Sequence, residues 1–277
     1  MKFKRKLLFV TVIASIVAIA PFSTFALSEQ PQKKNIDYIL ENANPEDIYL
    51  DENGKIQYSK NYLNLMEEKN GQLKKSYQKY LQTKDLMISD ITIQPVSNGI
   101  VPYGFCYNDR TLNVPTYQQE RNHWCGPAAV KETLQFLNGS SLTQAQYASN
   151  MQTDADGSTI VYKLTNELNR RQSRHTYQYE DVTSESRFTQ ILIADVMDSD
   201  VGVPFILHAL TGSLYRYNGN TLRHYLVVNG GNMPQKKVTY VDSWNADYGR
   251  GTTLGRYTDT RSNVANTVIS SGRFVIW

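Results

Sequence analysis

Three residues in the second half of the chain have the side chains needed for acyl transfer through a thiol. Cys125 stands in the segment QERNHWCGPAAV, at the expected start of a helix. His224 opens the apolar run HYLVV, and Asp242 closes the next run, VTYVD. A nucleophile, a base and an acid that orients the base are the working parts of such a site.

The position of Cys125 favours its reactive form. A thiol attacks only as its thiolate, and an ordinary cysteine, with a pKa of about 8.5, holds little thiolate at neutral pH. The positive end of the expected helix favours the anion, and the imidazolium of His224 favours it more strongly. Gly126 is expected to let a substrate approach the backbone closely. The alternative is an inert, buried cysteine, the common state of free cysteines.

His224 and Asp242 are expected to meet through a hairpin. Asn229-Gly230-Gly231 is a turn signal between their two strands. In an antiparallel pair the start of one strand lies beside the end of the next. Asp242 can then accept the imidazole N–H and stabilise the charged ring. The alternative is that both are ordinary polar residues at strand ends.

The three other histidines are weaker candidates for the base. His123 lies in an expected loop, without an acid placed to orient it, and His175 lies in a polar stretch rich in arginine. His208 lies within an expected strand, where a hydrogen-bonded core histidine is the favoured interpretation. No cluster of His, Cys and Asp has the spacing of a metal site, and the chemistry needs no cofactor.

Two further features could assist the reaction. Gln119 lies six positions before Cys125, where its amide can donate to the oxyanion alongside the Cys125 backbone N–H. The adjacent Gln118 is an alternative, and both could instead be surface residues. Trp244 can cover the hydrogen bond between His224 and Asp242 and exclude water from it, or can simply belong to the core.

The first residues predict export. A basic start, an apolar run over residues 7–22 and small residues before Ala26 are typical of a secretory signal peptide cleaved near Ala26. An uncleaved anchor is the alternative, although the run is short for a span of about 20 residues. The protein is therefore expected to be extracellular, with no stable membrane insertion after cleavage.

Residues 27–102 are expected to form a helical accessory segment or pro-segment. Apolar residues recur at helical spacing over residues 58–81. Such a stripe either docks on a neighbouring core or covers the active-site cleft until it is removed.

The composition excludes other classes of protein. The net charge of +3 is too small to indicate nucleic-acid binding. The 2 cysteines, Cys106 and Cys125, are too few for a disulfide-stapled scaffold. A bridge between them would make Cys125 unreactive, and a non-catalytic binding module with that disulfide remains an alternative.

The main domain, residues 103–277, is predicted to be α+β. The helices come first, at 125–137, 143–150, 159–169 and 186–197. Strands follow at 202–210, 222–228, 237–242 and 273–277. Helices followed by strands indicate a helical half packed on an antiparallel sheet.

The order Gln119, Cys125, His224, Asp242 resembles that of the papain-like cysteine peptidases, and Asp242-Ser243-Trp244 resembles their Asn-Ser-Trp motif with the acid in place of the amide. The CGPAA segment and the GVPFI run before the histidine strand are more specifically similar to the bacterial double-glycine-leader, bacteriocin-processing peptidases. The resemblance covers roughly residues 112–277. It implies a stand-alone, secreted relative, because the chain has no Walker motif.

The sequence thus predicts an enzyme that hydrolyses peptide bonds through a thioester on Cys125, with a peptide or protein substrate. In this prediction the N-terminal helical half carries the nucleophile, and the C-terminal sheet carries His224 and Asp242. An amidase or acyltransferase on the same fold is the alternative, because nucleophiles other than water can intercept the acyl-enzyme. The residues do not predict an oligomeric state.

Overall fold

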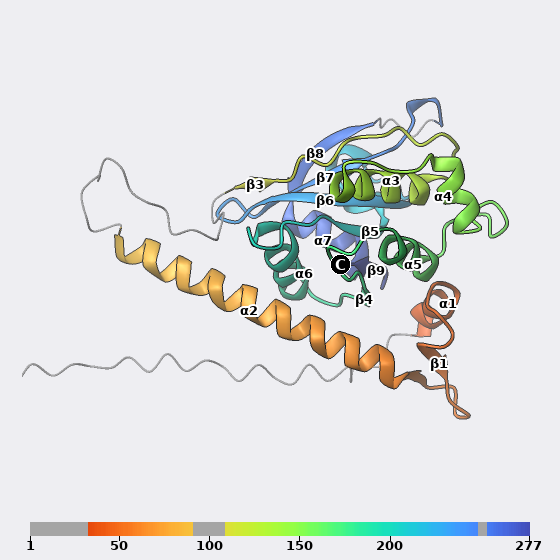
Figure 1. The fold of residues 1–277 in the computed structure, drawn as a ribbon, viewed down its shortest axis with the longest axis horizontal. Coiled ribbons are helices and arrows are strands. Elements are labelled where there is room, and N and C mark those ends of the chain that lie inside the picture. Colours follow the sequence, from red (N-terminus) through yellow and green to blue (C-terminus); the bar gives the residue numbers. More distant parts are fainter. Residues whose placement is uncertain (1–32, 91–108, 249–253) are drawn as a thin grey trace, which may run out of the picture. The chain divides into compact units, whose positions relative to one another are not determined.

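The computed structural model describes residues 33–90, 109–248 and 254–277, and the segment 31–277 forms one compact unit (Figure 1). The expected signal peptide and Cys106 lie outside the described residues. No helix among the described residues has both the length and the apolar composition needed to cross a membrane.

A seven-stranded sheet forms the centre of the fold. Its strand order is β4-β9-β5-β6-β7-β8, all neighbours are antiparallel, and β3 also pairs with β6. The strands are β3 (Arg110–Thr111), β4 (Tyr179–Asp181), β5 (Phe205–Leu210), β6 (Arg223–Asn232), β7 (Lys237–Asp242), β8 (Gly255–Thr260) and β9 (Phe274–Ile276). Strands β5, β6, β7 and β9 lie where strands were predicted, whereas the sequence patterns did not reveal β3, β4 and β8.

Helices pack on this sheet and on one another. They are α3 (Cys125–Asn138), α4 (Gln144–Asn150), α5 (Val161–Arg171), α6 (Glu185–Ile191), the π-helix η1 (Leu192–Met197) and α7 (Arg261–Ile269), with short 3₁₀ turns η2 (Thr211–Ser213), η3 (Tyr215–Tyr217) and η4 (Ala246–Tyr248). Helix α3 packs on β6, and α4 and α5 pack on α3. The predicted α+β class is confirmed, with Cys125 at the start of a helix in the helical half and His224 and Asp242 on the antiparallel sheet.

Local signals explain where α3 begins and ends. Pro127 lies in its first turn, where a missing N–H costs nothing. Gly139 ends the helix in the left-handed conformation, with φ of 73°, and its N–H bonds to the Gln135 carbonyl. The buried side includes Ala128, Val130 and Leu134.

The accessory segment consists of α1 (Lys33–Asn42), the hairpin β1 (Ile48–Leu50) and β2 (Ile56–Tyr58), and α2 (Lys60–Asp90). The predicted stripe docks on the main domain: α2 packs on η1 and α6, and Tyr62, Met66 and Leu73 of the stripe are buried. Lys69 is also buried, and its Nζ donates to the Thr176 carbonyl at 3.1 Å. In these contacts α2 docks on a core, as one of the two interpretations of its stripe predicts.

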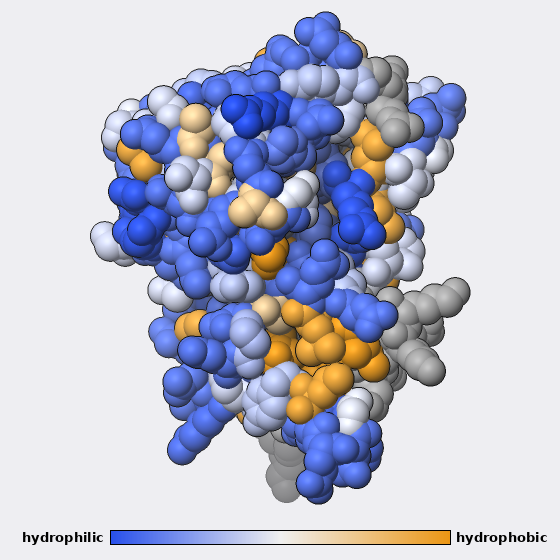
Figure 2. Space-filling model, turned by 90° about the vertical axis from the view of Figure 1, so that its right-hand side faces the viewer, coloured by the Kyte–Doolittle hydropathy of each residue, from blue (hydrophilic) through white to orange (hydrophobic). Residues whose placement is uncertain are grey.

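The face of the molecule seen in Figure 2 is mostly hydrophilic, and hydrophobic side chains gather in the lower half of the view. Leu40 of α1 and Leu50 of β1 are among the large hydrophobic residues that remain exposed.

Candidate active site

The start of α3 presents Cys125 to the sheet. Cys125 is a free, partly buried thiol, and its disulfide partner in the alternative interpretation, Cys106, lies outside the described residues. No side chain caps the start of α3, where Trp124 is the N-cap residue. The partial positive charge of the helix N-terminus is therefore available to an anion at Cys125.

His224 and Asp242 form a buried pair. The Nε2 atom of His224 lies 2.9 Å from Oδ1 of Asp242, and neither side chain is exposed to solvent. His224 also adjoins the nucleophile. The His224 Nδ1 atom is buried and has no hydrogen-bond partner. The Cys125 thiol is nevertheless close enough to the ring to raise the pKa of His224. The structure thus brings together all three residues that the sequence singled out.

The charges of the pair favour an imidazolium. Burial alone lowers the pKa of His224, but the Asp242 carboxylate and, to a smaller extent, Cys125 overcome this effect and raise it to about 10. Burial likewise acts to raise the pKa of Asp242, but His224, the Tyr217 hydroxyl and the Trp244 N–H together hold it below its usual value. Each charge is therefore stabilised by its partner.

The hairpin that joins the pair differs from the predicted one. Residues 229–231 continue β6 instead of turning, and the chain turns between Asn232 and Lys237. A bulge between Val228 and Gly230 adds one residue, Asn229, to β6. As a result Asp242 pairs with Leu226, diagonally across from His224 and on the same face.

The bulge determines which face carries the acid. Gly230 pairs with Thr239, and if Asn229 paired in regular register instead of bulging out of the ladder, Asp242 would lie opposite Val227. The side chain of Val227 points to the other face of the sheet, because successive residues of a strand alternate. Asn229 is held in place by Leu112, whose N–H donates to the Asn229 carbonyl at 2.7 Å and whose carbonyl accepts from Nδ2 at 2.8 Å.

Trp244 lies against His224, in the position expected for a residue that covers the hydrogen bond between His224 and Asp242. Its ring stands edge-on to the His224 ring, with centroids 5.5 Å apart at 85°, and it is 7% exposed. Its backbone N–H also donates to Oδ1 of Asp242 at 2.9 Å. The tryptophan therefore restricts water near the pair and fixes one lone pair of the acid.

The structure separates the two candidate glutamines. Gln118 is exposed, whereas Gln119 is fully buried. The Gln119 Nε2 donates to the carbonyls of Arg121 and Asn122, at 3.0 and 3.1 Å, and Oε1 is buried without a partner. Both amide hydrogens are therefore engaged within the loop, and donation to an oxyanion would require one of these bonds to open.

The remaining histidines have other environments. The expectation that His123 has no acid was wrong, because its Nε2 lies 2.6 Å from Oδ1 of Asp154, although its side chain is 32% exposed. Burial and the nearby Lys69 cation lower the pKa of His175 to about 2. His208 is a hydrogen-bonded core histidine, as predicted, with Nδ1 2.8 Å from the Tyr38 hydroxyl.

Two residues beside the pair were not expected from the sequence. The Tyr217 hydroxyl donates to Oδ2 of Asp242 at 2.7 Å. Glu132 is buried in α3, where burial raises its pKa well above the usual value and Oε1 accepts the Tyr117 N–H at 2.9 Å. A glutamate within the apolar side of an amphipathic helix was a signal that could have identified Glu132, whereas no comparable signal marked Tyr217.

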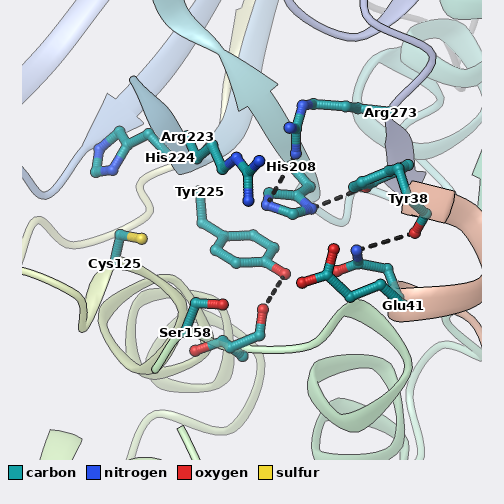
Figure 3. A pocket seen from close by; sticks show the side chains of 11 residues that line it. Tyr38, Glu41, Cys125, Ser158, His208, Arg223, His224, Tyr225 and Arg273 are labelled. Atoms are coloured by element: carbon teal, nitrogen blue, oxygen red, sulfur yellow. Dashed lines mark hydrogen bonds between the residues drawn. The ribbon is translucent and has the colours of Figure 1, made fainter. Parts of the chain in front are cut away.

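A small pocket of about 40 Å³ opens beside Cys125 and His224 and extends to Tyr38 and Glu41 of α1 (Figure 3). The helix that reaches the site is thus α1, whereas the longer α2 docks on η1 and α6. Within the part of the chain that the structure describes, no group of three His, Cys, Asp or Glu side chains could hold a metal ion.

Gly126 is required for close packing beside the nucleophile. A Cβ atom there would lie 2.2 Å from Oγ1 and 2.5 Å from Cβ of Thr159. Gly126 was expected to let a substrate approach the backbone, but Thr159 occupies that space. The Thr159 carbonyl accepts a hydrogen bond from the Tyr225 hydroxyl at 2.9 Å.

Gly126→Ala is expected to destabilise the protein by about 1–3 kcal/mol and to reduce activity, because the added methyl group overpacks the Thr159 wall. The matched control is Gly71→Ala in α2, where nothing lies within 4 Å of the added atom. The control should stabilise by about 0.5–1 kcal/mol, since alanine favours a helix interior. Urea unfolding at constant m-value measures both, and equal midpoints for the two variants would contradict the packing argument.

Two solved structures show low-identity similarity to this chain. The peptidase domain of Streptococcus ComA, a bi-functional ABC transporter involved in a quorum sensing pathway, has 16% identity and a TM-score of 0.39, and the match covers 60% of this chain and 97% of that one. Xylellain, a cysteine protease from Xylella fastidiosa, has 14% identity and a TM-score of 0.40, with coverage of 61% and 85%. No curated protein matches the sequence significantly.

The sequence itself matches a family model over residues 111–265, which is more than half of the chain. This range contains Cys125, His224 and Asp242. The chain therefore belongs to the Peptidase_C39 like family and, as the sequence predicted, is a cysteine peptidase.

Proposed function

We propose that the protein is a secreted cysteine peptidase in which Cys125, His224 and Asp242 act as a catalytic triad. The observation that carries the proposal is the buried contact of 2.9 Å between His224 Nε2 and Asp242 Oδ1, with the Cys125 thiol close enough to the ring to affect its protonation and in the same pocket. This contact leaves Nδ1 of His224 for proton exchange with the thiol and the substrate.

The proposed reaction has two halves. The Cys125 thiolate attacks a peptide carbonyl carbon, and His224 donates its Nδ1 proton to the leaving amine as the C–N bond breaks. The resulting thioester is then attacked by water, which gives a proton to His224. Collapse of the tetrahedral intermediate that water forms with the thioester releases the carboxylate product and restores the thiolate and imidazolium.

The surrounding residues have supporting roles in this proposal. Asp242 orients the ring and stabilises its charge. The Cys125 backbone N–H and Gln119 donate to the oxyanion, with Gln119 releasing one of its two loop hydrogen bonds as the intermediate forms. Because catalytic hydrogen bonds commonly tighten only when substrate is bound, the unbonded His224 Nδ1 in the free enzyme is compatible with this role.

Secretion rests on the sequence alone. The basic start and the apolar run before Ala26 support export and cleavage of a signal peptide. N-terminal sequencing of the protein recovered from the culture medium tests this part, and a mature chain that begins with Met1 would contradict it.

The function is tested by thiol labelling followed by product analysis. Cys125 should react with a fluorescent iodoacetamide probe at mildly acidic pH, where ordinary thiols are slow, and the rate should not depend on reductant. The cleaved peptide should carry a free carboxylate even when an amine nucleophile is added. Amide products would indicate an acyltransferase, and slow labelling that requires reductant would support the disulfide alternative.

A further inference from the structure

The pocket beside Cys125 contains more positive charge than its own residues balance. Two arginines line it, Arg223 on β6 and Arg273 just before β9. Neither makes an ion pair with a carboxylate among the residues that the structure describes. Figure 3 shows the pocket with Cys125 and His224 at one end, Glu41 and Tyr38 at the other, and Arg223 between them.

The environment of Arg273 is unusual for a cation. The residue is 7% exposed, and its Nε has no hydrogen-bond partner. Its other contacts are with neutral groups: its Nη1 lies 3.4 Å from Nε2 of His208, and the Tyr38 side chain interacts with the guanidinium through its hydroxyl and through its ring, 4.6 Å from the guanidinium carbon. A guanidinium stays charged in proteins, and a buried charge is costly unless an opposite charge compensates it.

The rest of the lining does not provide that compensation. Burial lowers the pKa of His208 well below its usual value, so its ring is neutral. The Tyr225 hydroxyl is engaged by the Thr159 carbonyl. Glu41 is the one acidic side chain of the lining, and it is exposed, lies on α1 and makes no ion pair with either arginine. With Cys125 and His224 set aside, the lining has two positive charges, on Arg223 and Arg273, and one negative charge, on Glu41. The pocket therefore has an excess of one positive charge.

We propose that this pocket is a substrate subsite for a carboxylate, bound by Arg223 and Arg273, close to the scissile bond. The proposal rests on the proposed peptidase function, because it identifies the class of peptide that Cys125 attacks. Arginine binds carboxylates through paired, charge-assisted hydrogen bonds. Helix α1 closes the outer end of the subsite, where Glu41 limits the excess positive charge. The accessory segment thereby contributes directly to specificity.

A peptide series tests the proposal on the full chain. Glutamate is moved one position at a time along a neutral, C-terminally amidated peptide, and each peptide is compared with its glutamine counterpart. At one position near the cleaved bond the glutamate peptide should have a kcat/KM about 10- to 100-fold higher, the range for a hydrogen bond to a charged group. A second arm compares free and amidated C-termini, which distinguishes a terminal carboxylate from an acidic side chain.

Charge variants of the pocket should change this ratio in opposite directions. Arg223→Gln should lower the preference for glutamate, and Arg223 is exposed, so that folding is not at risk. Glu41→Gln, at the other end, should raise the preference. Arg174→Gln is the matched control, because Arg174 is an exposed arginine outside the lining, and it should leave the ratio unchanged. A purely structural role for these residues would not produce opposite changes.

A separate measurement distinguishes failure of this proposal from failure of the proposed function. Each peptide is also tested for its ability to slow iodoacetamide labelling of Cys125, which requires no turnover. Acidic peptides should protect at lower concentrations than their glutamine or amide counterparts. Cleavage or protection without any preference for a carboxylate in either arm would overturn the subsite. Preferential protection without Cys125-dependent cleavage would preserve the subsite and overturn the peptidase assignment.

Discussion

Replacing Cys125 with alanine is expected to abolish peptide hydrolysis, with a loss in kcat on the order of 10⁶-fold, as found when the nucleophile of an equivalent triad is removed. The physical reason is that the thioester cannot form, so that only binding and oxyanion stabilisation remain. The measurement is the single-turnover rate on a fluorogenic peptide, with the purified full chain.

Two pairs of variants make this test specific. Cys106→Ala is the control for Cys125→Ala and should retain full activity. His224→Ala should lose about as much as Cys125→Ala, because the two residues act as a unit. His123→Ala is its matched control, since His123 also contacts a carboxylate, that of Asp154, and should retain activity. Substantial hydrolysis by the Cys125 variant would refute the proposed nucleophile.

Asp242→Asn is expected to lower kcat/KM by a smaller factor, roughly 10- to 100-fold. Oδ1 of Asp242 accepts from both His224 Nε2 and the Trp244 N–H, and an asparagine oxygen can replace it there. The asparagine Nδ2 would then face the Tyr217 hydroxyl, which can turn from donor to acceptor. Asp242→Leu offers no acceptor and should lose about 10⁴-fold. Equal losses for the two variants would contradict an orienting role.

The same substitution should change the pH profile. With the pKa of His224 raised to about 10, activity should persist into alkaline solution and fall as the imidazolium loses its proton. Removing the carboxylate charge makes the imidazolium less stable, so the pKa of His224 falls and the alkaline limb moves to lower pH. The pH dependence of kcat/KM for the wild type and for Asp242→Asn measures this shift. An unchanged or higher alkaline limit would show that Asp242 does not stabilise the charge.

The hairpin brings His224 and Asp242 together as predicted, although its turn lies elsewhere than predicted. The sequence predicted that His224 and Asp242 meet across adjacent antiparallel strands, and they do. The predicted turn at residues 229–231 was wrong, because Gly230 and Gly231 pair with both β7 and β3. Their lack of side chains serves this close approach: a Cβ on Gly230 would lie 2.9 Å from the Arg110 carbonyl oxygen. A glycine pair marks tight backbone contact as well as turns.

The accessory segment could be predicted in part. The helical stripe of α2 was visible in the sequence because it follows the helical period, and the buried Tyr62, Met66 and Leu73 match it. The role of α1 beside the pocket was not visible. Glu41 and Tyr38 have no unusual neighbours in the sequence, and only their position next to Arg273 and His208 gives them a part in the site.

Local sequence was enough to identify the chemical groups and the elements that carry them. Cys125 begins a helix because Pro127 fits a first turn and Gly139 ends the helix, and His224 and Asp242 lie in apolar runs that form strands. Tertiary structure decided which groups face one another. Because Asn229 bulges out of the ladder, Asp242 pairs with Leu226 on the face of His224, and the bulge is held by Leu112, which is distant in sequence. A strand alternates its faces residue by residue, so regular pairing of Asn229 in place of the bulge would move Asp242 to the opposite face from His224. The local sequence around Asn229 does not indicate the hydrogen bonds to Leu112 that hold the bulge in place.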